Sequence, residues 1–211
     1  MIPILGFATY SRTDLADRLL ASIDYPVEHL VIIDNSGTKT WQPTQPAAVK
    51  NLWVLQIPFG LGLVGAWNLI VKSTPYAPYW LLVNDDCTFE PGALEVIAAY
   101  ANPEGVGHPD VNPKWTAMVL GEGCVDRVGL YDERFYPLYF DDNDYERRVI
   151  AAGVEQYVIP AKIHHDNSAS INYERNALTF KRNEAWYHEK AQTQDLTWSW
   201  TLASRRANRW D

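Results

Sequence analysis

YWLLVNDDCTFEPGAL, residues 79–94, decides how the chain is interpreted, because an apolar run there meets two adjacent carboxylates. The run from Tyr79 to Val83 has the composition of a buried strand, and it ends at Asn84-Asp85-Asp86. Paired carboxylates repel each other and resist burial. A turn or a helix N-cap accounts for them locally, since Asp and Asn favour both places. The alternative is a cation site, in which the repulsion becomes affinity for a divalent metal.

Composition limits the classes of protein that need to be considered. The 211 residues are 47% apolar with a formal net charge of −8, which suits one large domain or a domain with a tail. The negative charge argues against general nucleic-acid binding, and no apolar run is long enough to predict a membrane span. Cys87 and Cys124 have no paired spacing, so we expect neither a disulfide framework nor a zinc ribbon, and a cytoplasmic location.

Strand-like and helix-like segments alternate through the first half of the chain. This alternation predicts an α/β fold with a mostly parallel central sheet flanked by helices. In the second half we expect a helix after Asp142 that ends at Gly153. The strands are expected at residues 2–8, 30–33, 52–57, 79–83, 115–120 and 156–159, the other helices near residues 15–23, 66–71 and 91–100, and loops at 38–50 and 102–114.

The C-terminal part of the chain has a different pattern. From Tyr173 it looks helical nearly to its end, which predicts a domain at residues 1–172 with a helical segment, 173–211, docked on it. The aromatic residues Trp198, Trp200 and Trp210 suit packing against a second copy in a homo-oligomer as well as packing against the chain's own sheet.

Polar side chains follow three of the expected strands. Thr9-Tyr10, Asp34-Asn35 and Asn84-Asp85-Asp86 stand where the parallel strands end. Ligands of open α/β sheets bind in the crevice outside the carboxyl ends of the strands. Helix capping alone does not predict three such clusters on one edge, so the sequence favours a binding site there.

Further acids at 141–144 and a histidine pair at 164–165 add to this set. Asp86, a diphosphate and one histidine would make a site for Mn²⁺ or Mg²⁺, because both cations prefer oxygen ligands and Mn²⁺ also accepts imidazole. Local explanations stay open. Asp141, Asp142 and Asp144 suit the first turn of a helix, where acids complement the dipole, and the histidines suit a structural role.

Six blocks in the right order resemble the GT-A fold, family 2-like inverting glycosyltransferases, over about residues 2–183. Three of the blocks depart from the family pattern, with Ser11 in place of Asn, Trp67 in place of Arg, and Asn84 in the first slot of the DxD motif. The pair Asp141-Asp142 is similar to the form found in the related galactofuranosyltransferases. The blocks are Phe7 to Leu15, Val31 to Ser36, Gly60 to Asn68, Asn84 to Asp86, Gly129 to Arg148, and His165.

The resemblance implies a Rossmann-like GT-A enzyme, a hexosyl- or pentosyltransferase, that moves a sugar from a nucleotide diphosphate sugar to an acceptor hydroxyl with inversion. It implies that Asp142, beside Asp141, is the catalytic base, and that Asp86 and His165, with His164 as the alternative, bind Mn²⁺ or Mg²⁺. The acceptor is left open among a glycan, a lipid-linked sugar, a protein and modified DNA. The residues implied to bind the nucleotide sugar are Thr9, Tyr10, Arg12, Asp34, Asn68, Asn84 and Asp85.

Two other functions are compatible with parts of the sequence. A sugar nucleotidyltransferase also uses a nucleotide-binding sheet and paired acids, but it is expected to carry a glycine-rich phosphate loop after the first strand. Here Thr9-Tyr10-Ser11-Arg12 stands at that place. A non-catalytic carbohydrate- or partner-binding module of the same fold is kept open by Trp67 and Asn84.

Overall fold

Four parallel strands form one half of the sheet in the computed structural model, which describes residues 1–38, 40–166 and 173–198. They lie in the order β3-β2-β1-β4. All but one residue of β1 and all but one of β4 are buried, as expected for strands covered on both faces. The four strands are β1 (Ile2–Thr9), β2 (Val27–Asp34), β3 (Val49–Gln56) and β4 (Tyr79–Asn84).

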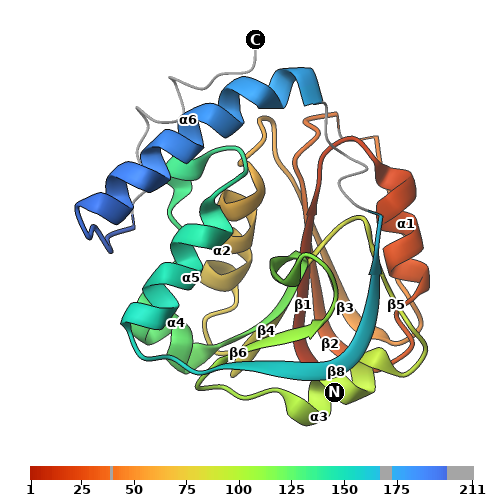
Figure 1. Cartoon of the computed structure of the whole chain (residues 1–211). Coiled ribbons are helices and arrows are strands. Elements are labelled where there is room, and N and C mark those ends of the chain that lie inside the picture. Colours follow the sequence, from red (N-terminus) through yellow and green to blue (C-terminus); the bar gives the residue numbers. More distant parts are fainter. Residues whose placement is uncertain (39, 167–172, 199–211) are drawn as a thin grey trace.

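The second half of the sheet is mixed. Its strands are β5 (Cys87–Phe89), β6 (Val106–Asp110), β7 (Ala117–Gly121) and β8 (Gln156–His165). β7 pairs antiparallel with β4, and the order continues β7-β6-β8-β5. Four of the seven strand pairings in the described residues are parallel, so the mostly parallel α/β sheet is confirmed. β8 curls along the sheet and carries His164 and His165 to β5 (Figure 1).

Helices cover both faces of the sheet, and each face has its own cluster of buried apolar side chains. α1 (Thr13–Ala21) and α3 (Ala93–Tyr100) pack on one face. α2 (Leu63–Ser73), α4 (Glu122–Val128) and α5 (Asp141–Ala151) pack on the other. The four parallel strands therefore lie between two helical layers, and the carboxyl ends of the strands are left as the accessible edge.

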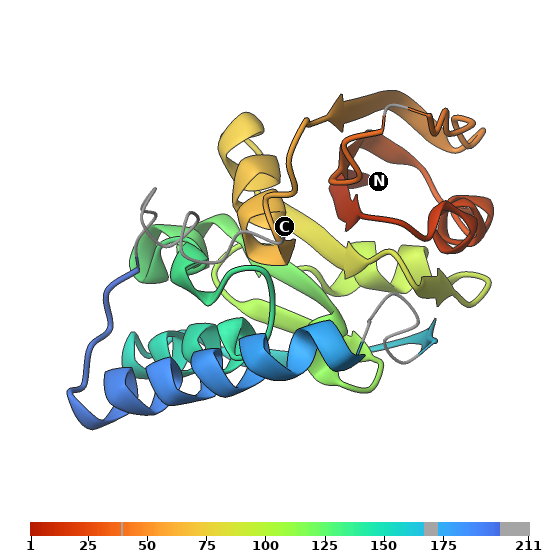
Figure 2. The ribbon, with the colours of Figure 1, turned by 90° about the horizontal axis from the view of Figure 1, so that it is seen from above.

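A long helix, α6 (Tyr173–Gln192), runs beside α5 in both views (Figures 1 and 2). Two fully buried polar side chains, Asn183 and Lys190, attach it to the rest of the protein. Lys190 Nζ lies 2.7 Å from Asp132 Oδ2 and 2.8 Å from Asp144 Oδ1. The helix is thus fixed by specific polar contacts in addition to apolar packing.

Some boundaries differ from the sequence-based expectation. The expected loop at 102–114 contains β6, whose sequence VGHPD has little strand character. Pro91 lies in a turn, and α3 begins after Gly92, whose positive φ of 80° suits glycine. The C-terminal helix ends at Gln192, whereas helix was expected nearly to the end of the chain. Trp200 and Trp210, which were considered for partner packing, lie outside the described residues.

The described part of the chain contains no helix of the length and apolarity that crossing a membrane requires.

Candidate active site

Three predicted residues lie together at the carboxyl edge of the parallel strands. The strand register places Thr9 of β1 beside Asp34 of β2, and Ala8 of β1 beside Asn84 of β4. Thr9 and Asp34 are almost fully buried, at 2% and 1% exposure. These three residues are up to 75 positions apart in the sequence, and the strand pairing brings them to one short stretch of the sheet edge.

Each of these three side chains has a buried oxygen that finds no hydrogen-bond partner among the described residues. The atoms are Thr9 Oγ1, Asp34 Oδ2 and Asn84 Oδ1. The other Asp34 oxygen, Oδ1, accepts a bond from the Ser36 N–H at 2.9 Å, which fixes the orientation of the carboxylate. An unsatisfied buried polar atom costs about 1–3 kcal/mol, and native proteins keep few of them. Three at one edge mark a place that a polar ligand would stabilise.

Asp86 and His165 are brought together by the pairing of β5 with β8. Cys87 and His165 are register partners, and His165 Nε2 lies 3.1 Å from Asp86 Oδ1. Both side chains are almost fully buried, at 6% and 5% exposure. Burial lowers the pKa of His165, but the hydrogen bond and charge of Asp86 outweigh it, so the pKa lies above the ordinary value.

His164 faces the other way. Neighbouring residues of a strand point to opposite faces, and His164 is 57% exposed, with Nε2 2.8 Å from Glu90 Oε1. Of the two histidines, His165 therefore has the geometry of the predicted ligand. Its Nδ1 lies 3.3 Å from the carbonyl oxygen of Asn112, a contact that orients the ring with Nε2 towards Asp86.

The Asp86–His165 pair fits a cation with open coordination positions. Within the residues that the structure describes, no group of three or more His, Cys, Asp or Glu side chains has the arrangement of a metal site. One carboxylate and one imidazole suit Mn²⁺, and the remaining positions would go to diphosphate oxygens and water.

The acid pair Asp141-Asp142 begins α5. Burial and the neighbouring charge of Asp142 raise the pKa of Asp141 to about 8. Burial also raises the pKa of Asp142, which is partly buried and accepts the Asn143 N–H through Oδ1 at 2.9 Å. The two carboxyl groups titrate as a coupled pair, and burial favours the protonated form of each. Asp144 is occupied separately, by ion pairs with Arg148 at 2.9 Å and with Lys190.

Three of the predicted nucleotide-binding residues are not part of the row of buried oxygens at the strand ends. Tyr10 is 57% exposed, and Arg12 pairs with Asp14 at 2.6 Å at the start of α1. The Asn68 side chain is buried between Tyr131 and Glu133. It donates to the Tyr131 carbonyl (2.9 Å) and to Glu133 (3.0 Å) and accepts the Tyr131 N–H (2.9 Å). These bonds occupy the Asn68 amide within the protein, and its role in nucleotide binding stays a prediction. Asp85 is buried next to Asp86.

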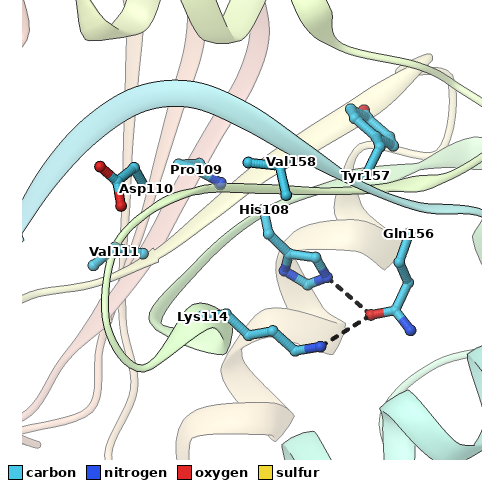
Figure 3. Close-up of a pocket in the computed structure, with 8 residues that line it drawn as sticks. All are labelled: His108, Pro109, Asp110, Val111, Lys114, Gln156, Tyr157 and Val158. Atoms are coloured by element: carbon cyan, nitrogen blue, oxygen red, sulfur yellow. Dashed lines mark hydrogen bonds between the residues drawn. The ribbon is translucent and has the colours of Figure 1, made fainter.

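A cavity of about 340 Å³ lies between β6 and β8 (Figure 3). His108 and Lys114 enter it and converge on Gln156 Oε1, at 3.1 and 3.4 Å. None of the predicted site residues is among those that line this cavity. From the resemblance we also expect Asp34, Asp86, Asp142 and His165 to line a single hollow, and this stays a prediction.

Two contacts at the site had no sequence signal. Asn112 orients His165 through a backbone carbonyl, which any residue type supplies. Asn35 holds the glycine-rich turn before α2, because its Oδ1 accepts the Leu61 N–H at 2.9 Å. No local pattern indicated this contact, because Leu61 lies 26 residues after Asn35.

Comparisons with known proteins agree with this architecture. No family model matches the chain. A galactofuranosyl glycosyltransferase of Leishmania donovani is 31% identical over 97 residues, which are 44% of this chain and 22% of that protein. The structure of S. aureus TarS matches with a TM-score of 0.58 and 16% identity over 77% of this chain and 36% of TarS.

Fragments of TarS, residues 1–349, match in complexes with nucleotides. The complex with UDP-GlcNAc gives a TM-score of 0.60 at 16% identity, covering 88% of this chain and 66% of the fragment. The complex with UDP gives 0.56 at 14% identity, covering 75% and 58%. The chain thus spans about a fifth of the curated relative and about a third to two thirds of these structures. The fold implied by the resemblance is therefore confirmed: the chain has the GT-A fold of glycosyltransferases.

Proposed function

We propose that the protein is an inverting glycosyltransferase that moves a sugar from a uridine diphosphate sugar to an acceptor hydroxyl. The observation that carries the proposal is the row of unpaired buried oxygens at the ends of β1, β2 and β4. Asp34 Oδ2 is an acceptor ready for a base N–H, because Ser36 holds the other oxygen. The UDP and UDP-GlcNAc complexes of TarS support this choice of donor.

Asp86 and His165 would hold Mn²⁺ or Mg²⁺ against the diphosphate. When bound there, the cation would supply electrostatic and Lewis-acid stabilisation of the negative charge on the leaving diphosphate. The contact of His165 with the Asn112 carbonyl oxygen keeps Nε2 directed at the same place as Asp86 Oδ1.

Asp142 would act as the general base. The acceptor oxygen bonds to the anomeric carbon while the bond to the diphosphate oxygen breaks on the opposite face, and the hydroxyl proton passes to Asp142. The electron pair of the broken bond leaves with the nucleoside diphosphate. A raised pKa suits this role, because a base is most effective when its pKa approaches the working pH. Burial and the charge of Asp142 raise the pKa of Asp141 to about 8, which disfavours a second negative charge beside the base.

Release of UDP from UDP-sugars with Mn²⁺ and an acceptor mixture tests the proposal. Asp142→Asn should lower kcat at least about 100-fold, the low end of general-base contributions, while the Kd for UDP changes less than about twofold. Asp126→Asn, an exposed acid on α4, is the matched control and should keep full activity.

The outcomes separate the possible functions. Full turnover by the Asp142→Asn variant would refute the assignment of the base. Tight binding of UDP with Mn²⁺ but no turnover by the wild-type protein would identify a non-catalytic binding module. Absence of both binding and turnover would overturn the proposed function itself.

A further inference from the structure

The two residues before the acid pair have an unusual backbone. Tyr139 and Phe140 have φ angles of 77° and 64°, in the left-handed region. Side chains other than glycine rarely occupy this region, and aromatic residues there are strained. Phe140 is also the N-cap of α5, and within the part of the chain that the structure describes no side-chain hydrogen bond caps this helix. Some other part of the protein must therefore hold this turn and, with it, Asp141 and Asp142.

Asn183 of α6 makes the polar contacts to the turn. It is fully buried, and its Nδ2 donates to the carbonyl oxygens of Phe135 (3.0 Å), Leu138 (2.8 Å) and Tyr139 (3.2 Å). Its Oδ1 accepts from Arg182 Nε at 3.1 Å and Nη2 at 2.7 Å, which fixes the orientation of the amide.

Arg182 extends the same contact. Its guanidinium also donates to the Tyr136 carbonyl oxygen. Together, Arg182 and Asn183 bind four carbonyl groups within residues 135–139, a segment outside their own helix. A helix that was only docked by apolar packing would not need this concentration of donors on one irregular turn.

Aromatic rings of α6 cover the same two residues. The Phe180 ring meets the rings of Tyr139 and Phe140 edge-on, with centroids 5.3 and 4.9 Å apart. Tyr187 stacks on Phe140 at 5.7 Å. The side chains of Tyr139 and Phe140 therefore contact α6, and so does the carbonyl group of Tyr139.

The opposite side of the turn rests on the glycine-rich segment before α2. The Pro137 carbonyl accepts the Leu63 N–H at 2.8 Å, and a Cβ on Gly62 would stand 2.8 Å from that oxygen. The Tyr136 hydroxyl donates to the Gly60 carbonyl at 3.2 Å. The turn is thus held between α6 and a segment that Asn35 connects to the end of β2.

We propose that α6 is a clamp for the catalytic base, in which Asn183, oriented by Arg182, is a positioning residue for Asp142. The proposal rests on the proposed function for the role of Asp142, but the clamp itself is a structural claim about the turn at 135–140. Release of the clamp lets Tyr139 and Phe140 relax to ordinary backbone angles and moves the start of α5. A displacement of about 1 Å of a catalytic group can cost about 100-fold in rate.

The test compares Asn183→Leu, which keeps the volume but removes the amide, with Thr179→Val. Thr179 is buried one turn earlier on α6 and takes no part in these bonds. Asn183→Leu should lower kcat about 10- to 100-fold, with the Kd for UDP changed less than about twofold. Thr179→Val should leave both unchanged.

A second measurement does not depend on activity. Carboxyl NMR titration should show that Asn183→Leu lowers the pKa of Asp141, because the released turn exposes the carboxyl group to water. Asp142 and Asp144 face Asp141 from its own helix in wild type and in both variants. If the wild-type protein transfers no sugar, the proposed function fails, and the titration still decides whether the clamp exists.

A purely structural role for Asn183 would lower the midpoint of unfolding while kcat and the pKa of Asp141 stayed at the wild-type values, and that result would overturn the clamp. Should Asn183→Leu fail to fold, Arg182→Met replaces it. That variant keeps the Asn183 amide but removes the guanidinium that orients it. We therefore expect smaller decreases in kcat and in the pKa of Asp141.

Discussion

Asp141 is a carboxyl group in a place that disfavours its charge. Burial and the neighbouring Asp142 raise its pKa to about 8 from an ordinary 3.8. Between about pH 4 and pH 8 the folded protein holds a proton that the unfolded chain has lost, so the free energy of unfolding falls as the pH rises. Asp141→Asn removes this dependence. Urea unfolding should show the variant more stable than wild type by roughly 2–5 kcal/mol at pH 9 and equal to it near pH 4. Parallel stability curves for the two proteins would contradict the buried, protonated state of Asp141.

At the scale of elements, the attachment of α6 depends on one buried ammonium group. Lys190 Nζ contacts Asp132, Asp144 and the Thr197 carbonyl at 2.7–2.8 Å, with no exposed side-chain surface. Removing one partner of a buried ion pair typically costs about 3–5 kcal/mol, because charge is left uncompensated. Lys190→Met should therefore lower the free energy of unfolding by about that amount in urea titration. Lys181→Met, an exposed lysine on the same helix, should change it by less than about 0.5 kcal/mol. Equal losses in the two variants would show that Lys190 does not anchor α6.

The elements also show what sequence reasoning can reach. β1, β2 and β4 were predicted, because strands buried on both faces are continuous apolar runs. β6 was missed because Gly107 and Pro109 are residue types that are rare in strands. Its extended conformation is stabilised by pairing with β7 and β8, which the local sequence does not reveal. Within the site, the pairing of Asp86 with His165 agrees with the resemblance, but the choice between the histidines needed the register of β8 against β5. Asn183 is one asparagine in a polar helix, so no local pattern indicated its contacts with a turn about 45 residues earlier.

For the whole molecule, the proposed ligand would join parts of the sheet that are separate in sequence. UDP with Mn²⁺ would give hydrogen-bond partners to the buried oxygens at the ends of β1, β2 and β4. It would also contact Asp86 and His165, which lie where β5 pairs with β8. Ligand at 100 times its Kd stabilises the folded state by about 2.7 kcal/mol, which should raise Tm by about 5–10 °C in a chain of this size. Asp34→Asn keeps the oxygen that Ser36 binds but places an N–H₂ group where a base N–H needs an acceptor. Thermal unfolding of this variant alone should match wild type, and the shift with UDP and Mn²⁺ should fall by at least half. An equal shift in both proteins would mean that Asp34 does not contact the base and that the nucleotide binds elsewhere.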